Sequence, residues 1–342
     1  MSQTSTTTHA DPGTSAIRGT AWQRLRARVV AAVAWAICRL PERPLLAIAD
    51  AAGSVAYRVS PARRRLARAN LHRVAAWMAD QGMGSEEVRE AAIDPRALER
   101  LVRSAFQHHA RYVLELVRAP VMTDAYVRAR VTVAAPEVLA EALAAEPVMV
   151  IGMHLGAIEL PGFYAWGVGR RRGVAPMETV MDPELQRWYA GIRGGLGLRI
   201  VGLQEARREL VAALRSGYLV GIVADRDITG GGAEVDLFGH PARLPLGPAL
   251  LLLEAPAPAY LATVRRTGQG RYIGHVEALP APPADGSRRA RATAFLQSEA
   301  RAFERAVVQA PEQWHAVFHP IWPDLDGPAQ PTQRTETQEE PA

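Results

Sequence analysis

The chain is 342 residues long, with 48% hydrophobic and 22% charged residues and a formal net charge of +5. This length is sufficient for a full hydrophobic core, and the composition is ordinary for a soluble or peripheral protein. Cys38 is the only cysteine, which excludes a disulfide framework and a cysteine-based metal site.

Basic residues are concentrated near the N-terminus: residues 17–73 contain twelve arginines but only Glu42 and Asp50 as acidic residues. The apolar stretch 29–38 is too short to span a bilayer, which needs about twenty residues. It predicts a basic amphipathic helix on an anionic membrane surface. The alternatives are a helix packed on the domain with solvated arginines, or a signal peptide, although no small-residue cleavage site follows. Nucleic-acid binding is not expected, because no aromatic residues alternate with the basic ones.

The pattern along the chain divides it into four parts. Residues 1–16 and 325–342 are polar and lack periodicity, which predicts a disordered lead and a disordered tail. Residues 17–118 are predicted to form an N-terminal helical, membrane-associating region. In residues 119–324, short apolar strands alternate with helices. That alternation predicts an α/β core, with a central mixed sheet flanked by helices.

The predicted strands are 129–133, 148–153, 173–180, 199–201, 219–224, 234–237, 259–265 and 272–276. The predicted helices between and after them are 136–145, 158–168, 183–191, 206–216, 246–254 and 288–309.

His154 follows a predicted buried strand and precedes a turn at Gly156. A histidine at the carboxyl end of a strand lies where open α/β sheets place ligands and chemistry. Glu159 follows five positions later, about 140° away on a regular helix. The two side chains therefore meet only if His154 lies in the turn and Glu159 inside the helix. The alternative is a structural histidine with a solvated glutamate.

A second charged segment follows the predicted strand 219–224. Asp225, Arg226 and Asp227 precede a glycine-rich bend, which indicates a charged, pre-oriented ligand site or a structural ion-pair cluster. Arg243 comes before a proline-restricted turn and a helix start, where an arginine suits a phosphate or an oxyanion. Turn chemistry alone also explains that segment.

The remaining candidates are less specific. Arg193 lies near a helix end. Glu178 lies at the end of a strand, where it is either a structural residue or part of the lining of the site. Residues 313–323 combine aromatic residues with two histidines and are predicted to form a strand and lid beside the site. No carboxylate or cysteine lies there at ligand spacing, so a metal site is not expected. There is no Gly-x-Ser-x-Gly, Walker A or Gly-x-Gly-x-x-Gly motif, which leaves a histidine with a carboxylate, suited to deprotonating a hydroxyl.

These motifs together resemble the bacterial membrane-associated lipid acyltransferases, which include lipid A lauroyl/myristoyl acyltransferases and phosphatidylinositol mannoside acyltransferases. The resemblance rests on His154 and Glu159 at the His-x4-Asp/Glu spacing, on segments 224–249 and 313–323, and covers about residues 18–325. Segment 224–249 is most similar to the mannoside branch.

The resemblance implies a glycerolipid acyltransferase-like fold and an O-acyltransferase that needs no cofactor. The acyl donor would be acyl-CoA or acyl carrier protein, and the acceptor a hydroxyl of a membrane glycolipid, at the cytoplasmic face of the membrane. His154 would be the general base, and Glu234 or Glu159 the acid that orients it. Implied substrate-binding residues are Glu178, Arg193, Asp225, Arg226, Asp227 and Arg243.

One departure from the family pattern concerns the acceptor. Ala157 and Ile158 replace the usual Asn and Trp, and Glu159 replaces Asp. Two other functions remain open on this fold: a non-catalytic glycolipid-binding protein, and a thioesterase that uses water as the acceptor.

Overall fold

The computed structural model describes residues 19–177, 182–194, 198–203, 205–228, 230–268 and 270–325, and the side chains of residues 192–194 lie outside this description. The predicted disordered lead, the predicted tail beyond Leu325, and Glu178 also lie outside the described residues.

Helices occupy the first part of the chain, as the sequence predicts. They are α1 (Ala21–Ile37), α2 (Glu42–Val59), α3 (Pro61–Asp80), α4 (Glu86–Glu90), α5 (Pro95–Arg118), the 3-10 turn η1 (Ala119–Val121) and α6 (Asp124–Arg130). Their starts follow capping chemistry: Thr20 and Gln23 form a capping box on α1, and Asp94 accepts from two amides at the start of α5. Among the described residues, no helix is long and apolar enough to cross a membrane.

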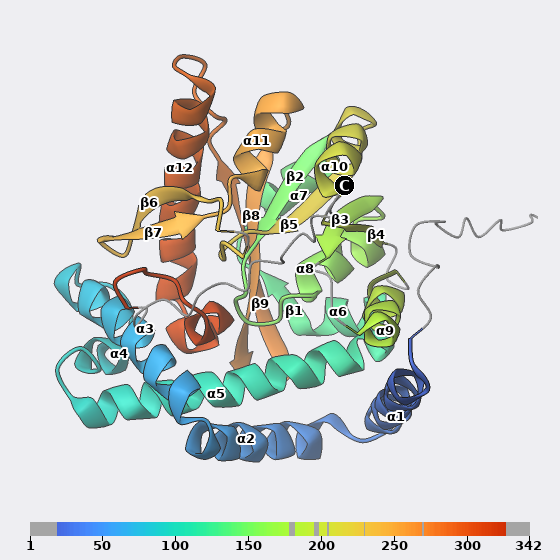
Figure 1. The fold of residues 1–342 in the computed structure, drawn as a ribbon, viewed down its shortest axis with the longest axis vertical. Coiled ribbons are helices and arrows are strands. Elements are labelled where there is room, and N and C mark those ends of the chain that lie inside the picture. The colour runs from blue at the N-terminus through green and yellow to red at the C-terminus, as the bar shows by residue number, and fades with distance from the viewer. Residues whose placement is uncertain are drawn as a thin grey trace, which may run out of the picture.

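The core of the molecule is a seven-stranded mixed sheet in the order β1-β9-β8-β2-β5-β3-β4 (Figure 1). The strands are β1 (Val131–Val133), β2 (Val148–Gly152), β3 (Gly173–Met177), β4 (Leu198–Gly202), β5 (Leu219–Val223), β8 (Ala259–Gly268) and β9 (Arg271–Leu279). Strands β8, β2, β5, β3 and β4 run parallel, whereas β9 and β1 run the other way. The predicted mixed sheet is confirmed.

Helices cover both faces of this sheet. They are α7 (Pro136–Ala144), α8 (Leu160–Phe163), the π-helical turn η2 (Tyr164–Val168), α9 (Pro183–Gly194), α10 (Ala206–Arg215), α11 (Gly247–Glu254) and α12 (Arg288–Val308). Strand side chains alternate between the faces. Met149 and Ile151 of β2 join the core cluster that contains α10, α11 and α12, whereas Val148 and Val150 pack with α7.

Two predicted strands are not part of the central sheet. Strand β6 (Ala233–Leu237) does not join the sheet; it pairs with β7 (His240–Leu244) in a separate antiparallel hairpin. The predicted strand in segment 313–323 is instead two 3-10 turns, η3 (Pro311–Gln313) and η4 (His315–Phe318), with one isolated bridge from Trp314 to Leu155. Figure 1 shows α5 and α2 side by side below the sheet, whereas α10 and α11 lie at its upper end.

Candidate active site

His154 and Asp225 form a hydrogen-bonded pair at the carboxyl ends of two neighbouring parallel strands. Gly152 of β2 lies opposite Val223 of β5, so the residues two positions further on also face each other. His154 Nδ1 lies 2.6 Å from Asp225 Oδ1, and the His154 amide donates to Asp225 Oδ2 at 2.9 Å. No hydrogen bond from the described residues reaches Nε2 of His154.

Asp225 is buried, yet it is held in its ionised form. Burial by itself raises the pKa of this carboxyl, but the attraction of His154 and the hydrogen bonds from His154 and Trp314 outweigh it and lower the pKa. Trp314 donates its indole Nε1–H to Asp225 Oδ2 at 2.8 Å. An ionised carboxylate only accepts hydrogen bonds, so Nδ1 of His154 carries a proton and Nε2 of the neutral ring is the acceptor.

The turn after His154 is fixed by backbone contacts on both sides. Gly156 has φ +61°, and a Cβ there would lie 2.2 Å from the Val264 carbonyl oxygen, so only glycine fits. Its amide donates to the Gln313 carbonyl at 2.9 Å, and the His315 amide donates to the His154 carbonyl at 2.6 Å. These contacts fix the backbone of the turn at His154, and the hydrogen bond to Asp225 orients its ring.

A buried ion pair supports the same turn. Arg266 and Glu115 form a bidentate pair with an Nε–Oε1 distance of 2.7 Å, and Tyr272 donates to the same carboxylate at 2.9 Å. Arg266 also donates to the Gly156 carbonyl at 3.1 Å. Because both charges are buried and paired with each other, removing either partner would leave the other uncompensated.

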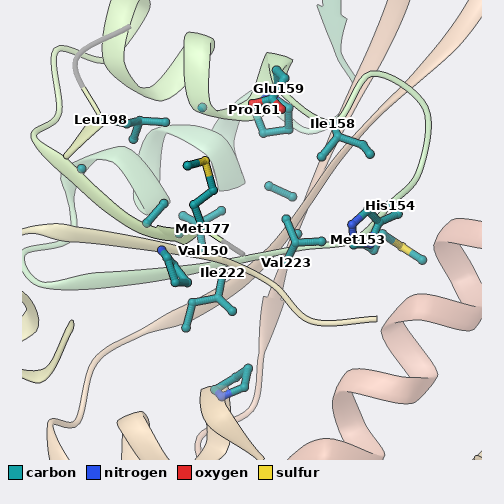
Figure 2. A pocket seen from close by; sticks show the side chains of 18 of the residues that line it. Val150, Met153, His154, Ile158, Glu159, Pro161, Met177, Leu198, Ile222 and Val223 are labelled. Atoms are coloured by element: carbon teal, nitrogen blue, oxygen red, sulfur yellow. The ribbon is translucent and has the colours of Figure 1, made fainter. Parts of the chain in front are cut away.

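A large apolar cavity of about 960 Å³ lies beside His154. In Figure 2, His154 lies at one end of the labelled side chains and Leu198 at the other, with Val150, Met177 and Ile222 between them. Gly173 and Gly221 contribute backbone from the strands. A Cβ added to Gly221 would meet no atom within 4 Å, so the cavity owes part of its width to this missing side chain.

The structure corrects the expected partner of His154. Glu234 lies at an exposed position of β6, because Ala233, Val235 and Leu237 on the same strand are buried and the intervening side chains point outward. It does not line the cavity, and the carboxylate at Nδ1 is Asp225, which the sequence interpretation placed among the substrate-binding residues.

The other predicted residues are distributed around this pair. Glu159 is the residue before α8 and lines the cavity, as does the half-buried Arg226. Asp227 accepts from the amides of Gly230 and Gly232, which stabilises the glycine-rich bend. Arg243 lies opposite Glu234 in the hairpin and is exposed.

Arg193 belongs to α9, but its side chain lies outside the described residues, as does the whole of Glu178. Among the described residues, no group of three or more His, Cys, Asp or Glu side chains could hold a metal ion.

Two functional contacts were not predicted from the sequence. One is the hydrogen bond from Trp314 to Asp225, and the other is the Arg266–Glu115 pair. Both join residues far apart in the chain, and Arg266 lies one residue beyond the predicted end of its strand. Arg266 follows Arg265 at the polar end of the predicted strand, so nothing in the sequence marked it as a buried residue.

The fold and the paired histidine define a known class of enzyme. The family model of the bacterial lipid A biosynthesis acyltransferases matches residues 20–323. The chain therefore belongs to this family of lipid acyltransferases, and it is an acyltransferase.

Similar proteins carry a more specific name. The phosphatidylinositol mannoside acyltransferase of Mycobacterium tuberculosis is 27% identical over 253 residues, which cover 70% of this chain and 77% of that protein. The phosphatidylinositol mannoside acyltransferase of Mycolicibacterium smegmatis is 28% identical over 231 residues, 65% of this chain and 72% of that protein.

Proposed function

We propose that this chain transfers a fatty acyl group from acyl-CoA or acyl carrier protein to a hydroxyl of a membrane glycolipid of the phosphatidylinositol mannoside type. The observation that carries the proposal is the His154–Asp225 pair beside a large apolar cavity. The names of the similar proteins support the class of acceptor.

In the proposed reaction, His154 is the general base. The acceptor hydroxyl gives its proton to Nε2 while its oxygen attacks the carbonyl carbon of the thioester. Asp225 accepts from Nδ1 throughout and stabilises the imidazolium. When the tetrahedral intermediate collapses, the C–S bond breaks and the thiolate takes the proton from Nε2. The products are an ester-linked lipid and a free thiol.

The cavity would hold the acyl chain. Its volume lies at the upper end of the range for small-molecule sites, roughly 300–1,000 Å³. Its walls are mostly aliphatic, with Leu185 from α9 and Leu210 from α10 facing the strands. An alkyl chain placed there would be removed from water, at roughly 0.8 kcal/mol for each buried CH₂ group.

The N-terminal helices would rest on the membrane surface. Trp22, Val29 and Val33 are each more than half exposed and share one face of α1, because their spacings of seven and eleven residues return to the same direction. Ile48 and Val59 repeat the eleven-residue spacing on α2 and are also more than half exposed. These apolar side chains and the nearby arginines suit an anionic lipid surface at the cytoplasmic face.

The test is a transfer assay that follows both products. Palmitoyl-CoA would be mixed with vesicles that contain phosphatidylinositol mannosides, and free thiol and acylated lipid would be measured for the wild type and His154→Ala. A parallel arm would supply acyl carrier protein as the donor. Vesicles without the glycolipid serve as the acceptor-free control.

We expect thiol release that depends on the acceptor, matches the acylated lipid in amount, and is lost in His154→Ala. Thiol release without an acceptor and without a lipid product would indicate a thioesterase instead. Glycolipid binding with no release from either donor would indicate a binding protein. Full transfer by His154→Ala would contradict the role of this residue.

A further inference from the structure

Two arginines and two histidines, here called the mouth cluster, lie on segments around the His154–Asp225 pair. Its members are Arg63 of α3, His109 of α5, Arg226 after β5 and His319 after η4. Arg226 and His109 both line the cavity that contains His154.

The ring of Phe318 joins two of these elements. The Arg63 guanidinium carbon lies 5.5 Å from the centroid of the Phe318 ring, and the His109 ring lies 5.0 Å from it. His319 follows Phe318 directly in the chain, and Asn70 fixes the His319 carbonyl with a hydrogen bond of 3.0 Å. The cluster is therefore attached to the packed part of the molecule.

Neither arginine of the mouth cluster forms an ion pair with an acidic residue in the part of the chain that the structure describes. Among the described residues, no carboxylate lies within 4.0 Å of the guanidinium of Arg63 or Arg226, unlike the paired Arg266. The nearest acids in the sequence are already engaged, because Asp225 accepts from His154 and Trp314, and Asp227 accepts from the amides of the glycine-rich bend.

The two histidines of the cluster are uncharged at neutral pH. Burial, together with the charges of Arg63, Arg266 and His154, lowers the pKa of His109 to about 4. Burial, with Arg226, His154 and Arg63, lowers the pKa of His319 to about 4. The positive charge of the cluster therefore comes from Arg63 and Arg226, which form no ion pair within the described residues, and such guanidinium groups favour an anionic ligand.

We propose that the mouth cluster binds a phosphate group of the substrate, with Arg226 and Arg63 as its charged ligands. Two sources share this chemistry: the diphosphate of a CoA donor and the phosphodiester of an inositol lipid acceptor. That these two molecules are the candidates rests on the proposed acyl transfer, whereas the existence of an anion site does not.

A binding experiment separates the two sources without turnover. Calorimetric titrations of the full-length protein would use CoA, glycerophosphoinositol, and their phosphate-free counterparts pantetheine and inositol. The variants are Arg226→Gln and Arg63→Gln. The matched control is Arg65→Gln, an exposed arginine two residues further along α3 and about 200° around the helix axis.

We expect CoA or glycerophosphoinositol to bind the wild type, and each site variant to weaken that binding about tenfold, as expected for loss of one charge-assisted contact. Arg65→Gln should bind like the wild type, and pantetheine and inositol should not distinguish the variants. The phosphate ligand whose binding weakens in the two site variants identifies the source of the phosphate group. Equal affinity in wild type and in the Arg63→Gln/Arg226→Gln double variant, or no binding of either phosphate ligand to the wild type, would overturn the proposal.

The outcome is independent of the transfer assay. If the phosphate ligand binds through Arg226 but no acyl transfer occurs, the anion site stands and the proposed reaction fails. If transfer occurs and the double variant binds both ligands normally, the reaction stands and the anion site fails. Thermal unfolding of each variant checks that the fold is intact.

Discussion

Asp225 and Glu234 lie nine residues apart in the sequence, but their environments are opposite. Asp225 follows a central strand, is buried, and receives three hydrogen bonds from His154 and Trp314. Glu234 lies in a two-stranded hairpin outside the main sheet and faces solvent. Of these two carboxylates only Asp225 contacts His154, because β5 is a neighbour of β2 in the sheet and β6 is not.

The largest expected effect comes from Asp225→Asn, set against Glu234→Gln. The amide cannot accept as an ionised carboxylate does, and it favours the wrong tautomer of His154, so kcat should fall about 10³- to 10⁴-fold, as for a related triad. Glu234→Gln should keep the wild-type rate to within about twofold, because surface changes usually have little effect. Both rates come from the transfer assay.

A large decrease in kcat for Glu234→Gln together with a small decrease for Asp225→Asn would show that Glu234, and not Asp225, orients His154. Circular dichroism and thermal unfolding of both variants would show whether a loss of rate reflects a loss of fold.

Trp314→Phe tests how much the hydrogen bond from Trp314 to Asp225 contributes to the activity of the His154–Asp225 pair. The indole donates to a buried carboxylate, and such a bond to a charged group contributes roughly 1.5–3 kcal/mol. We expect kcat to fall about tenfold or more while the KM for the donor changes little. Trp322→Phe is the matched control, since its indole donates to the Leu237 carbonyl instead. Equal losses of kcat in the two variants would indicate a packing effect alone.

Gly221→Val tests the cavity wall that β5 forms. Gly221 lies on this strand, four residues before Asp225. A valine side chain here would enter the open space of the cavity, because an added Cβ at Gly221 meets no atom within 4 Å. We expect transfer from palmitoyl-CoA to fall by about tenfold relative to transfer from a short-chain acyl-CoA, since fewer methylene groups can be buried. Gly202→Val, also without a neighbour within 4 Å, is the control outside the cavity lining. An unchanged chain-length preference in Gly221→Val would argue that the acyl chain binds elsewhere.

Glu299 on α12 is a third carboxylate, which differs from both Asp225 and Glu234: it is buried, but neither oxygen has a partner among the described residues. Burial and the charge of Asp225 raise its pKa well above the usual value. Folding therefore favours the protonated form of Glu299, so the folded protein loses stability as the pH rises above the pKa that this carboxyl has in the unfolded chain.

Glu299→Gln should remove this pH dependence, because the amide does not titrate. We expect the variant to be more stable than the wild type at pH 8, by on the order of 1 kcal/mol, with a smaller difference at pH 5. Urea unfolding at the two pH values measures this. A wild type that gains stability from pH 5 to pH 8 relative to Glu299→Gln would show that Glu299 is ionised in the folded protein.

The order of strands and helices was readable from the sequence, because apolar runs such as 148–153 and 219–224 alternate with helical patterns. Hairpin strand β7 was not, since it is short, contains Pro241 and exposes most of its residues. His154 was identified from its place after a strand. Its partner was not, because only the register of Gly152 against Val223 brings Asp225 to it, and spacing along the chain does not encode register.

The tautomer of His154 is the most direct test of its pairing with Asp225. Nitrogen-15 NMR of protein labelled at its histidine rings, with a His154→Gln difference spectrum for assignment, reports which ring nitrogen carries the proton when the ring is neutral. Because Asp225 lies 2.6 Å from Nδ1, we predict a protonated Nδ1 in the wild type and a shift toward protonated Nε2 in Asp225→Asn. A wild-type ring protonated at Nε2 would contradict both the pairing and the role as base, because Nδ1 would have no proton to donate to Asp225 and Nε2 could not accept one from a hydroxyl.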